Sequence, residues 1–464
     1  MINFILNNET IETDFPSGSL LLDYVRYYKS LKGTKIGCRE GDCGACTVLI
    51  GEVVDGILSY KQVTSCLTPI GNVAGKHVVT IEGLNMDQLS PVQEHMINES
   101  GTQCGFCTVG FVVSLSGFCL ANNAATYEDA IAAIDGNICR CTGYKSIERA
   151  AEKITHDLAK KSLSNPISWL IENHFIPPYF GEIVDRLDKI DLPVTKSLGR
   201  IIGGGTDLYV QKHLELIDEH AQHIALKNEL RFIRTENNTI HVGGSVTVTE
   251  FLESKEIQAF FPRLREHIKL VSSSPIRNIS TFAGNFVNAS PIGDFTAFFI
   301  ALDASIELSK GDSSRTIKLK DFYKGYKDLD MLDGELITDI IFNAPSKTSK
   351  FNLEKVSKRI HLDIATVNSA ALISVQDGLI DQIYLSAGGV GPTPISLDKT
   401  TLFLTGKEIS AQNIIRANEI AQQEISPIGD VRGTADYKRL LLRQLLYAHF
   451  IKLFPNQLTL KDLV

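Results

Sequence analysis

The sequence predicts a multidomain α+β protein, and three observations support this fold class. The chain has 464 residues, which is too long for one hydrophobic core and suggests three or four domains. Its apolar fraction of 44% and charged fraction of 22% are ordinary for globular proteins. Strand-like and helical patterns occupy different segments, and each of the first two segments carries its own set of cysteines.

Residues 1–84 are predicted to form a small β-rich domain. Ser19 is placed to cap a helix on which Leu21, Val25 and Tyr28 share one face. A cysteine-rich loop follows this helix. Short apolar runs predict the strands at Ile2–Leu6, Thr10–Phe15, Thr47–Ile50, Gln62–Thr64 and His77–Ile81. Two strands, a helix and then the cysteine loop is the order expected of a β-grasp ferredoxin.

The cysteine loop has the spacing of a plant-type 2Fe–2S site. Four residues separate the first two cysteines, two separate the next pair, and nineteen precede the last. The glycines between them allow backbone N–H groups to approach sulfur. Unrelated core cysteines or a zinc site are the alternatives, but paired zinc knuckles fit only half of the set. The four predicted ligands are Cys38, Cys43, Cys46 and Cys66.

Residues 85–160 are predicted to form a four-helix domain with a second cysteine set. Ser90 and Gln93 form a capping box, and later helices are expected after Cys107, from Thr126 and from Ser146. Two cysteine pairs join these helices in two turns that would meet at one end of the bundle. Four thiolates without a nearby histidine favour a second 2Fe–2S site over a catalytic metal. Its predicted ligands are Cys104, Cys107, Cys139 and Cys141, while Cys119 is expected to be a buried structural thiol.

Residues 161–192 are interpreted as a linker, and residues 193–345 as a third domain with two loops of small residues. The first loop, Ile201–Leu208, runs from a strand through three glycines into a helix start. Such a loop can present backbone amides to a phosphate, although a glycine-rich turn is more often only a turn. The second loop, Thr281–Asn285, is followed by Asp294. The pair is predicted to hold the two ends of a dinucleotide, without the G-x-G-x-x-G spacing of a Rossmann fold.

Residues 346–464 are predicted to form the last domain. Ala365–Ser374 and Gln382–Leu385 have strand-like patterns, Gly388–Pro394 is a turn, and Asp436–Leu453 is a helix.

Three motifs resemble the iron–sulfur part of the xanthine dehydrogenase and aldehyde oxidase family, the molybdenum hydroxylases. They are GCREGDCGACTV, QCGFC and NICRCTGY. The resemblance implies that the helical-domain cluster lies nearer a molybdenum cofactor and the ferredoxin cluster nearer a flavin. It also implies that Gln103 contacts the pterin of the molybdenum cofactor. Val109 stands where the family usually has proline, which is convenient but not obligatory in a first helical turn.

The two loops of the third domain resemble the FAD-binding domain of the same family, of the PCMH or vanillyl-alcohol-oxidase type. Residues 346–464 resemble its C-terminal flavoprotein domain, also α+β. Ala283 replaces the first of the family's paired glycines. Lys358, Arg359 and Asp363 are expected to border the flavin or the nicotinamide, or alternatively to form an exposed charged rim. The implied FAD contacts are Ile201, Ile202, Gly203, Gly204, Gly205, Thr206, Asp207, Leu208, Thr281, Phe282, Ala283, Gly284, Asn285 and Asp294, and by looser matches Val271, Ile337 and Lys355.

The resemblance covers nearly the whole chain and stops where the family's molybdenum-binding part would begin. It therefore implies the small subunit of a split xanthine dehydrogenase, with a molybdopterin-binding large subunit as partner in a heterodimer or two-plus-two heterotetramer. Electrons would pass from molybdenum through two 2Fe–2S clusters to FAD and then NAD, as hypoxanthine or xanthine becomes urate. No residue of this chain is expected to catalyse the purine chemistry.

Three other interpretations remain open. The chain is alternatively the equivalent subunit of an aldehyde, nicotinate, carbon monoxide or aromatic thioester hydroxylase. A standalone NADH–ferredoxin reductase leaves the second cluster and Gln103 without a use. A non-catalytic iron–sulfur protein leaves both flavin loops unexplained.

Charge and hydropathy exclude several classes of protein. The net charge of −8 and the lack of a basic run argue against nucleic-acid binding. No signal peptide and no membrane-spanning apolar run is visible. Nine cysteines then indicate metal ligands in a cytoplasmic protein, not disulfides.

Overall fold

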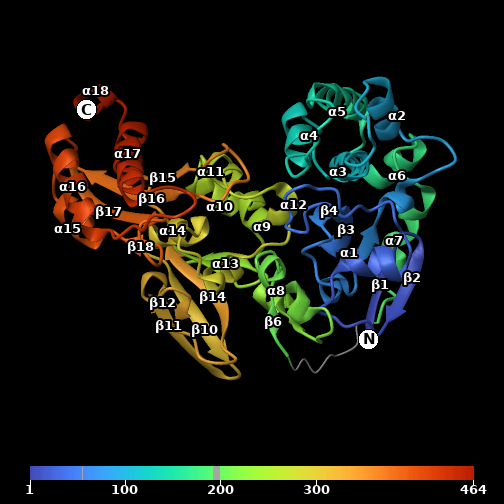
Figure 1. Ribbon diagram of the computed structural model, residues 1–464, viewed down its shortest axis with the longest axis horizontal. Coiled ribbons are helices and arrows are strands. Elements are labelled where there is room, and N and C mark those ends of the chain that lie inside the picture. Colours follow the sequence, from blue (N-terminus) through green and yellow to red (C-terminus); the bar gives the residue numbers. More distant parts are fainter. Residues whose placement is uncertain (55, 192–198, 464) are drawn as a thin grey trace. The chain divides into compact units, whose positions relative to one another are not determined.

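A computed structural model describes residues 1–54, 56–191 and 199–463, so the predicted boundary between linker and third domain near Leu192 lies outside the described residues. The chain folds into two compact units (Figure 1). The first unit comprises residues 1–226 and 273–280, and the second comprises 227–272 and 281–464. None of the described helices is long and apolar enough to cross a membrane.

The first unit begins with a five-stranded mixed sheet in the order β2-β1-β5-β3-β4. β1 pairs antiparallel with β2 and parallel with β5, whereas β3 pairs antiparallel with both β4 and β5. The expected strands are all present, because their apolar residues alternate into the core on one or both faces. The strands are β1 (Ile2–Leu6), β2 (Glu9–Thr13), β3 (Thr47–Val54), β4 (Ile57–Thr64) and β5 (His77–Val79).

The helix after β2 differs from its prediction. A short α1 (Leu21–Asp23) continues into the π-helical turn η1 (Tyr24–Tyr28). Leu20 occupies the N-cap position and makes no side-chain cap, whereas the Ser19 hydroxyl donates to the Ile217 carbonyl instead. The wider π turn also breaks the expected apolar face, since Leu21 and Val25 are 0% exposed but Tyr28 is 63% exposed.

Four helices form the predicted helical domain. The Ser90 capping box with Gln93 opens the first of them, and Thr126 caps the third. The fourth begins at Lys145, one residue before the expected Ser146, and a left-handed Tyr144 is its N-cap. Their bounds are α2 (Pro91–Asn98), α3 (Thr108–Leu120), α4 (Tyr127–Ala133) and α5 (Lys145–Asp157).

The segment interpreted as a linker is helical and well packed. α6 (Pro166–Glu172), the 3-10 turn η5 (Pro178–Glu182) and α7 (Ile183–Leu187) bury Leu170 and Phe180 in the core of the helical domain. Tyr179 donates a hydrogen bond of 2.8 Å to the Gly83 carbonyl. The apolar and aromatic residues of this segment therefore serve packing, as expected from their number.

Part of the predicted third domain also belongs to the first unit. β6 (Ile201–Ile202) pairs parallel with β7 (Gln222–His223), and α8 (Leu208–Leu216) lies between them in sequence. The residues 273–280 carry α12 (Ser274–Arg277) into the same unit. Arg277 forms a 2.8 Å ion pair with Asp135 just before the second cysteine turn.

The second unit has two antiparallel sheets, of order β11-β10-β14-β9-β8 and β15-β16-β17-β18. A shared core includes Phe282 and Phe298 from helices and Ile340 from the first sheet. The strands are β8 (Ile233–Glu236), β9 (Thr239–Gly243), β10 (Ser305–Lys310), β11 (Ser313–Lys318), β14 (Leu336–Asn343), β15 (Ser349–Val356), β16 (Val367–Gln376), β17 (Leu379–Gly388) and β18 (Ile395–Ser396), with a small ribbon of β12 (Tyr323–Gly325) and β13 (Asp328–Leu329).

Helices accompany both sheets of the second unit. The predicted C-terminal helix is present as α17 (Ala435–Leu453), which packs on β15 and β16. The others are α9 (Val248–Glu253), α10 (Lys255–Phe260), α11 (Leu264–Lys269), α13 (Phe282–Asn288), α14 (Asp294–Ile300), α15 (Asp398–Leu404), α16 (Ala411–Glu424) and α18 (Leu460–Leu463).

Candidate iron–sulfur and flavin sites

The structure brings the first four cysteines together as two pairs. The thiols of Cys38 and Cys43 interact, and so do those of Cys46 and Cys66. The Cys43 thiol donates to Cys38 and lowers the pKa of Cys38 to about 5, and Cys66 lowers that of Cys46 in the same way. Cys46 and Cys66 are 2% exposed. Three residues on one loop and a fourth at the end of β4 therefore share one site.

The second four cysteines also meet as two pairs. The Cys141 sulfur lies 3.6 Å from that of Cys104, and the thiols of Cys107 and Cys139 interact. Burial raises the pKa of Cys139, but hydrogen bonds donated by the Thr142 hydroxyl and N–H, the Cys141 N–H and the Cys107 thiol together outweigh it, so that the pKa is lowered overall. Both turns lie at one end of the helical domain, as the sequence predicts.

Two pairs of sulfurs fit a binuclear cluster better than a single ion. Each iron of a 2Fe–2S cluster takes two cysteine thiolates, so its ligands divide two and two. Within the described residues, three or more His, Cys, Asp or Glu side chains do not gather as ligands for one metal ion. Backbone N–H groups of Cys38 and Glu40 point at sulfurs of the first set at 3.4 and 3.3 Å. Those of Cys141 and Thr142 point at Cys139 at 3.4 Å.

A backbone hydrogen bond joins the two cysteine sets directly. The N–H of Ile138 donates to the carbonyl of Cys43 at 3.0 Å, and Cys139 is the next residue along the chain. Beside it, buried Asn137 donates to the Gly44 carbonyl at 3.2 Å and accepts from Ser114 at 2.8 Å. Ile138 and Asn137 were not predicted as site residues, and their only signal in the sequence is their place within the motif NICRCTGY.

The first glycine loop lies against the ferredoxin-like part of the same unit. Asn72 donates to the Gly203 carbonyl at 2.8 Å, and its amide oxygen contacts His223 at 2.7 Å. A Cβ on Gly204 would lie 1.8 Å from the Ile279 carbonyl oxygen, so only glycine fits there. Gly205 has a φ of +85° and would bring a Cβ 3.2 Å from the Leu67 carbonyl. Gly204 and Gly205 are therefore needed for packing and backbone conformation whether or not they bind a phosphate.

This packing places the loop beside two predicted cluster ligands. Ile202 and Tyr209, at either end of the loop, share one buried cluster with Cys46 and Cys66. The Tyr209 hydroxyl donates to the Gly18 carbonyl at 2.6 Å. The first glycine loop and the first cysteine set are thus parts of one packed structure.

The second loop belongs to the second unit. Thr281 caps α13 by accepting from the Gly284 N–H at 3.1 Å. Ala283, which replaces a family glycine, is 5% exposed and packs in the core, whereas Gly284 is exposed. A Cβ on Gly284 would approach only the Thr281 hydroxyl, at 3.0 Å. Alanine at position 283 therefore leaves the exposed glycine of the loop, Gly284, unchanged.

A buried ion pair follows this loop. The Lys355 ammonium lies 2.8 Å from the Asp294 carboxylate and 2.9 Å from the Leu270 carbonyl, next to Val271. Asn368 donates to the other carboxylate oxygen at 2.6 Å. The side chain of Lys355 is 2% exposed and that of Asp294 is 10% exposed. Lys355, which was predicted from a looser match, thus contacts Asp294. Asn368 was not predicted, because nothing in its sequence context marks it.

The remaining predicted residues have varied surroundings. Ile337 is 3% exposed, and its carbonyl would lie 2.0 Å from a Cβ on Gly244. Gln103 is exposed beside exposed Cys104. Arg359 forms a bidentate pair with Asp363 in an exposed loop, at 2.8 and 2.5 Å. Cys119 is fully buried on α3, as expected of a structural thiol.

Comparison with protein families assigns a known domain type to each part of the chain. A 2Fe-2S iron-sulfur cluster binding domain matches residues 4–71, and a [2Fe-2S] binding domain matches 80–152. An FAD binding domain in molybdopterin dehydrogenase matches 175–345, and a CO dehydrogenase flavoprotein C-terminal domain matches 353–453. This is the set and order of electron-carrier domains that the resemblance implies.

The chain belongs to the molybdenum hydroxylase family. It is 28% identical to a xanthine dehydrogenase of Emericella nidulans over 97% of this chain, and 27% identical to a xanthine dehydrogenase/oxidase of Rattus norvegicus over 86%. It spans 38% and 35% of the length of these two relatives. A carbon monoxide dehydrogenase structure from Hydrogenophaga pseudoflava is similar over 53% of this chain and 86% of that one, with 27% identity and a TM-score of 0.51. The matched models give the chain two 2Fe–2S-binding domains and an FAD-binding domain.

Proposed function

We propose that this chain is the electron-transfer subunit of a cytoplasmic xanthine dehydrogenase. The observation that carries the proposal is the 3.0 Å hydrogen bond from Ile138 to the Cys43 carbonyl. It joins a ligand of one predicted cluster to the neighbour of a ligand of the other, so electrons have a short route through few bonds. A protein that only stored iron would have no use for two thiol sets coupled in this way.

The eight paired thiols would hold two 2Fe–2S clusters. Clusters supply one-electron transfer, and FAD converts between single electrons and the hydride exchanged with NAD. The chain's contribution is burial and orientation. Cys46 and Cys66 lie in an apolar cluster, and the N–H groups of Glu40 and Thr142 point at sulfur, where they stabilise added negative charge.

Each unit carries proposed FAD contacts of its own: the first glycine loop in the first unit, and the second loop with the buried ion pair in the second. In the first loop, Ile201–Leu208, backbone groups between tightly packed glycines would face the phosphates. In the second, the exposed Gly284 allows close approach, and Asn285 and Asp294 follow with polar side chains. Lys355 neutralises Asp294, which lets that carboxylate remain buried as a hydrogen-bond acceptor.

The molybdenum cofactor would be held by a molybdopterin-binding partner subunit, in a heterodimer or two-plus-two heterotetramer. Exposed Gln103 and Cys104 at the end of the helical domain offer the contact toward its pterin. The xanthine dehydrogenases of Emericella nidulans and Rattus norvegicus are longer than this chain, and our proposal assigns the function of their remaining part to the partner.

Xanthine or hypoxanthine is the proposed substrate because the relatives named xanthine dehydrogenase match iron–sulfur and flavin parts together, over 85–98% of this chain. The carbon monoxide dehydrogenase structure matches over only 53%. That similarity favours, as the second candidate, the equivalent subunit of another molybdenum hydroxylase, for an aldehyde, nicotinate or carbon monoxide.

Co-purification with its partner tests the proposal. The complex should reduce NAD with xanthine and hypoxanthine, and the matched control is the same complex with Cys43→Ser. Faster turnover of an aldehyde, nicotinate or carbon monoxide than of either purine would replace the substrate assignment. If the Cys43→Ser complex kept both its activity and its cluster signal, the proposed electron route would be wrong.

A further inference from the structure

We propose that an aromatic pocket on the first unit, beside the first cysteine loop, binds an organic cation of the guanidinium class. The pocket has a volume of about 330 Å³ and lies between the η1 turn and the end of α8. Its lining residues are Phe15, Ser19, Leu20, Asp23, Tyr27, Tyr28, Ile217 and Asp218. None of the predicted cluster or flavin residues lines it, so it is distinct from the sites described above.

The π-helical turn exposes the aromatic wall of the pocket. Tyr24 stays buried and stacks on Tyr28, with ring centroids 5.1 Å apart, while Phe15 lies 5.4 Å from Tyr28. Tyr27 and Tyr28 are 65% and 63% exposed. A π turn is less stable than the α-helical geometry it interrupts, and such turns are frequent at functional sites.

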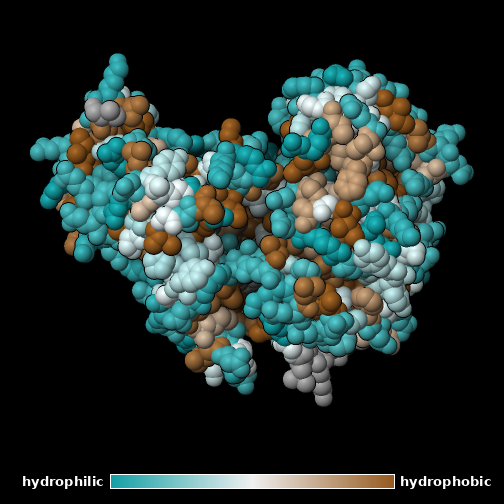
Figure 2. All heavy atoms as spheres, viewed as in Figure 1, coloured by the Kyte–Doolittle hydropathy of each residue, from teal (hydrophilic) through white to brown (hydrophobic). Residues whose placement is uncertain are grey.

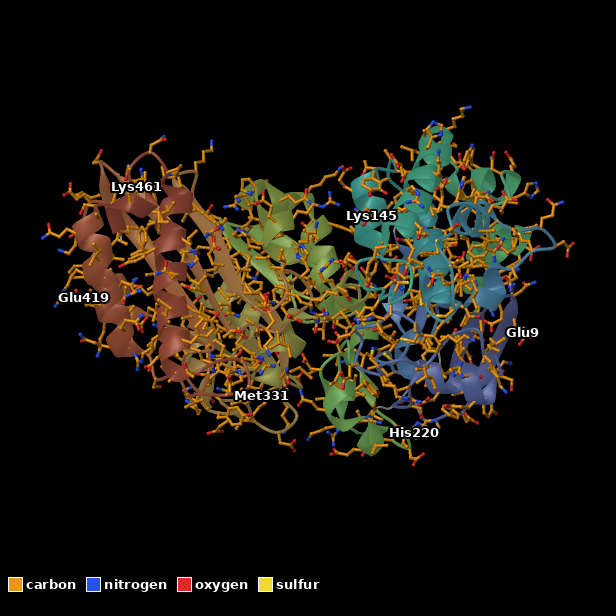
Figure 3. All side chains as sticks on the ribbon, turned by 45° about the horizontal axis from the view of Figure 1, so that its top comes forward. Glu9, Lys145, His220, Met331, Glu419 and Lys461 are labelled. Atoms are coloured by element: carbon orange, nitrogen blue, oxygen red, sulfur yellow. The ribbon has the colours of Figure 1, made fainter. Side chains whose placement is uncertain are left out.

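Backbone contacts hold the opposite wall in place. The Gly18 N–H donates to the Glu219 carbonyl at 2.9 Å, and the Ser17 hydroxyl accepts from the Ala221 N–H at 2.9 Å. Ser19 donates to the carbonyl of Ile217, which is itself a lining residue. Figure 3 labels His220, two residues beyond Asp218 and four beyond the end of α8, on the green part of the ribbon. The pocket is therefore formed before any ligand arrives, which reduces the entropy lost on binding.

The charge of the lining selects a cation. Two carboxylates and three aromatic rings face the pocket, and none of the described lining residues is basic. Asp23 is already paired with Arg39 at 2.6 Å, so exposed Asp218 supplies the net negative charge. Aromatic faces attract cations through their negative quadrupole. One such contact already occurs at this wall, where the Arg26 guanidinium lies 6.0 Å from the Tyr27 ring centroid.

A planar guanidinium suits this pocket best, because it can stack on Tyr28 and donate in its plane to the Asp218 carboxylate. Free arginine and an arginine side chain of a peptide share this chemistry. The pocket is open to solvent at Tyr27 and Tyr28, so both sources can enter. Figure 2 shows hydrophilic and hydrophobic side chains intermixed on the first unit, on the face that it presents.

Saturation-transfer NMR of the full chain with arginine tests this proposal. Citrulline is the matched ligand control, because it has nearly the same shape without the charge. We expect a dissociation constant for arginine on the order of 1–10 mM, typical of an exposed cation–π and ion-pair contact. Citrulline should give no saturable signal, and 1 M NaCl should weaken the binding of arginine.

Two variants assign the binding to this pocket. Tyr28→Leu keeps an apolar side chain but removes the ring, and Asp218→Asn removes the charge alone. Each should weaken arginine binding about threefold, whereas Tyr326→Leu, which alters an equally exposed tyrosine of the second unit, should not. Tighter binding of the tripeptide Gly-Arg-Gly than of free arginine would identify an arginine side chain of a protein as the natural ligand. Weaker binding of the tripeptide would identify a small molecule as the ligand. Equal binding of citrulline, or unchanged affinity in both pocket variants, would overturn the proposal.

Discussion

Gly110→Ala should damage the contact between α3 and the first cysteine loop. Gly110 lies in the first turn of α3, and a Cβ there would sit 2.2 Å from the Gly44 carbonyl oxygen and 2.9 Å from the Asn137 amide nitrogen. An ordinary carbon–oxygen contact is roughly 1 Å longer. The carbonyl cannot yield easily, because it accepts hydrogen bonds from the N–H and hydroxyl of Thr47 at 3.1 and 2.7 Å. Since Gly44 stands between Cys43 and Cys46, any movement reaches two predicted cluster ligands.

Gly117→Ala is the matched control on the same helix. Its Cβ would lie 2.8 Å from the terminal Cδ2 of Leu49, a side-chain atom that can move aside. Both substitutions gain up to about 1 kcal/mol of helix propensity, but only Gly110→Ala meets backbone, where overpacking costs about 1–3 kcal/mol. We therefore expect Gly110→Ala to be less stable than Gly117→Ala by about 1–3 kcal/mol.

Thermal unfolding and EPR spectroscopy measure this difference. The midpoint temperature of Gly110→Ala should be lower by about 2–4 °C per kcal/mol, as for a domain of 150–250 residues. The signal of the first cluster should broaden or shift in Gly110→Ala and keep its wild-type form in Gly117→Ala. Equal midpoints together with identical EPR spectra would refute the claim that α3 positions the cysteine loop through Gly110.

Four further outcomes are expected. Cys43→Ser should abolish the EPR signal of the first cluster and spare that of the second, and loss of both signals in a folded protein would contradict two separate sites. Gln103→Ala should slow reduction of the clusters by the molybdenum subunit without changing FAD content, and unchanged purine turnover would remove its proposed role. Burial lowers the pKa of His267 and His449 to about 4, whereas an exposed histidine has a pKa of about 6.5. Below pH 6.5 these two histidines therefore bind more protons in the unfolded chain than in the folded chain. Stability should therefore fall as the pH decreases from 6.5 towards 4, and a flat urea midpoint across this range would exclude that contribution. The chain expressed alone with excess FAD should reduce a dye with NADH but not with xanthine, and xanthine oxidation without the partner would contradict the proposed division of functions.

Spacing in the sequence was sufficient to predict both cysteine sets. Cluster ligands must lie at short, fixed separations on a loop, so the spacing of Cys38, Cys43 and Cys46 is visible within one short stretch of the sequence. The capping box of Ser90 and Gln93 is equally local and is confirmed. Glycine loops were also visible, but the sequence alone does not separate their packing role from a phosphate-binding role.

Local patterns failed where distant residues decided the geometry. Ser19 has the right identity for an N-cap, yet its hydroxyl bonds to Ile217, nearly two hundred residues away in the chain. The π turn that exposes Tyr28 was likewise invisible, because a helical pattern does not reveal one extra residue in a turn.

The sequence by itself was enough to predict the two cysteine sets, the order of the domains and the family. Each of these is carried by residues close together in the chain, whose spacing is set by the chemistry of the group they bind. Only the tertiary structure decided that Ile138 bonds to Cys43, that Asn368 joins Asp294 and Lys355, and that residues 273–280 belong to the first unit. These contacts link residues far apart in sequence, and they form only when buried polar groups must find partners inside the folded core.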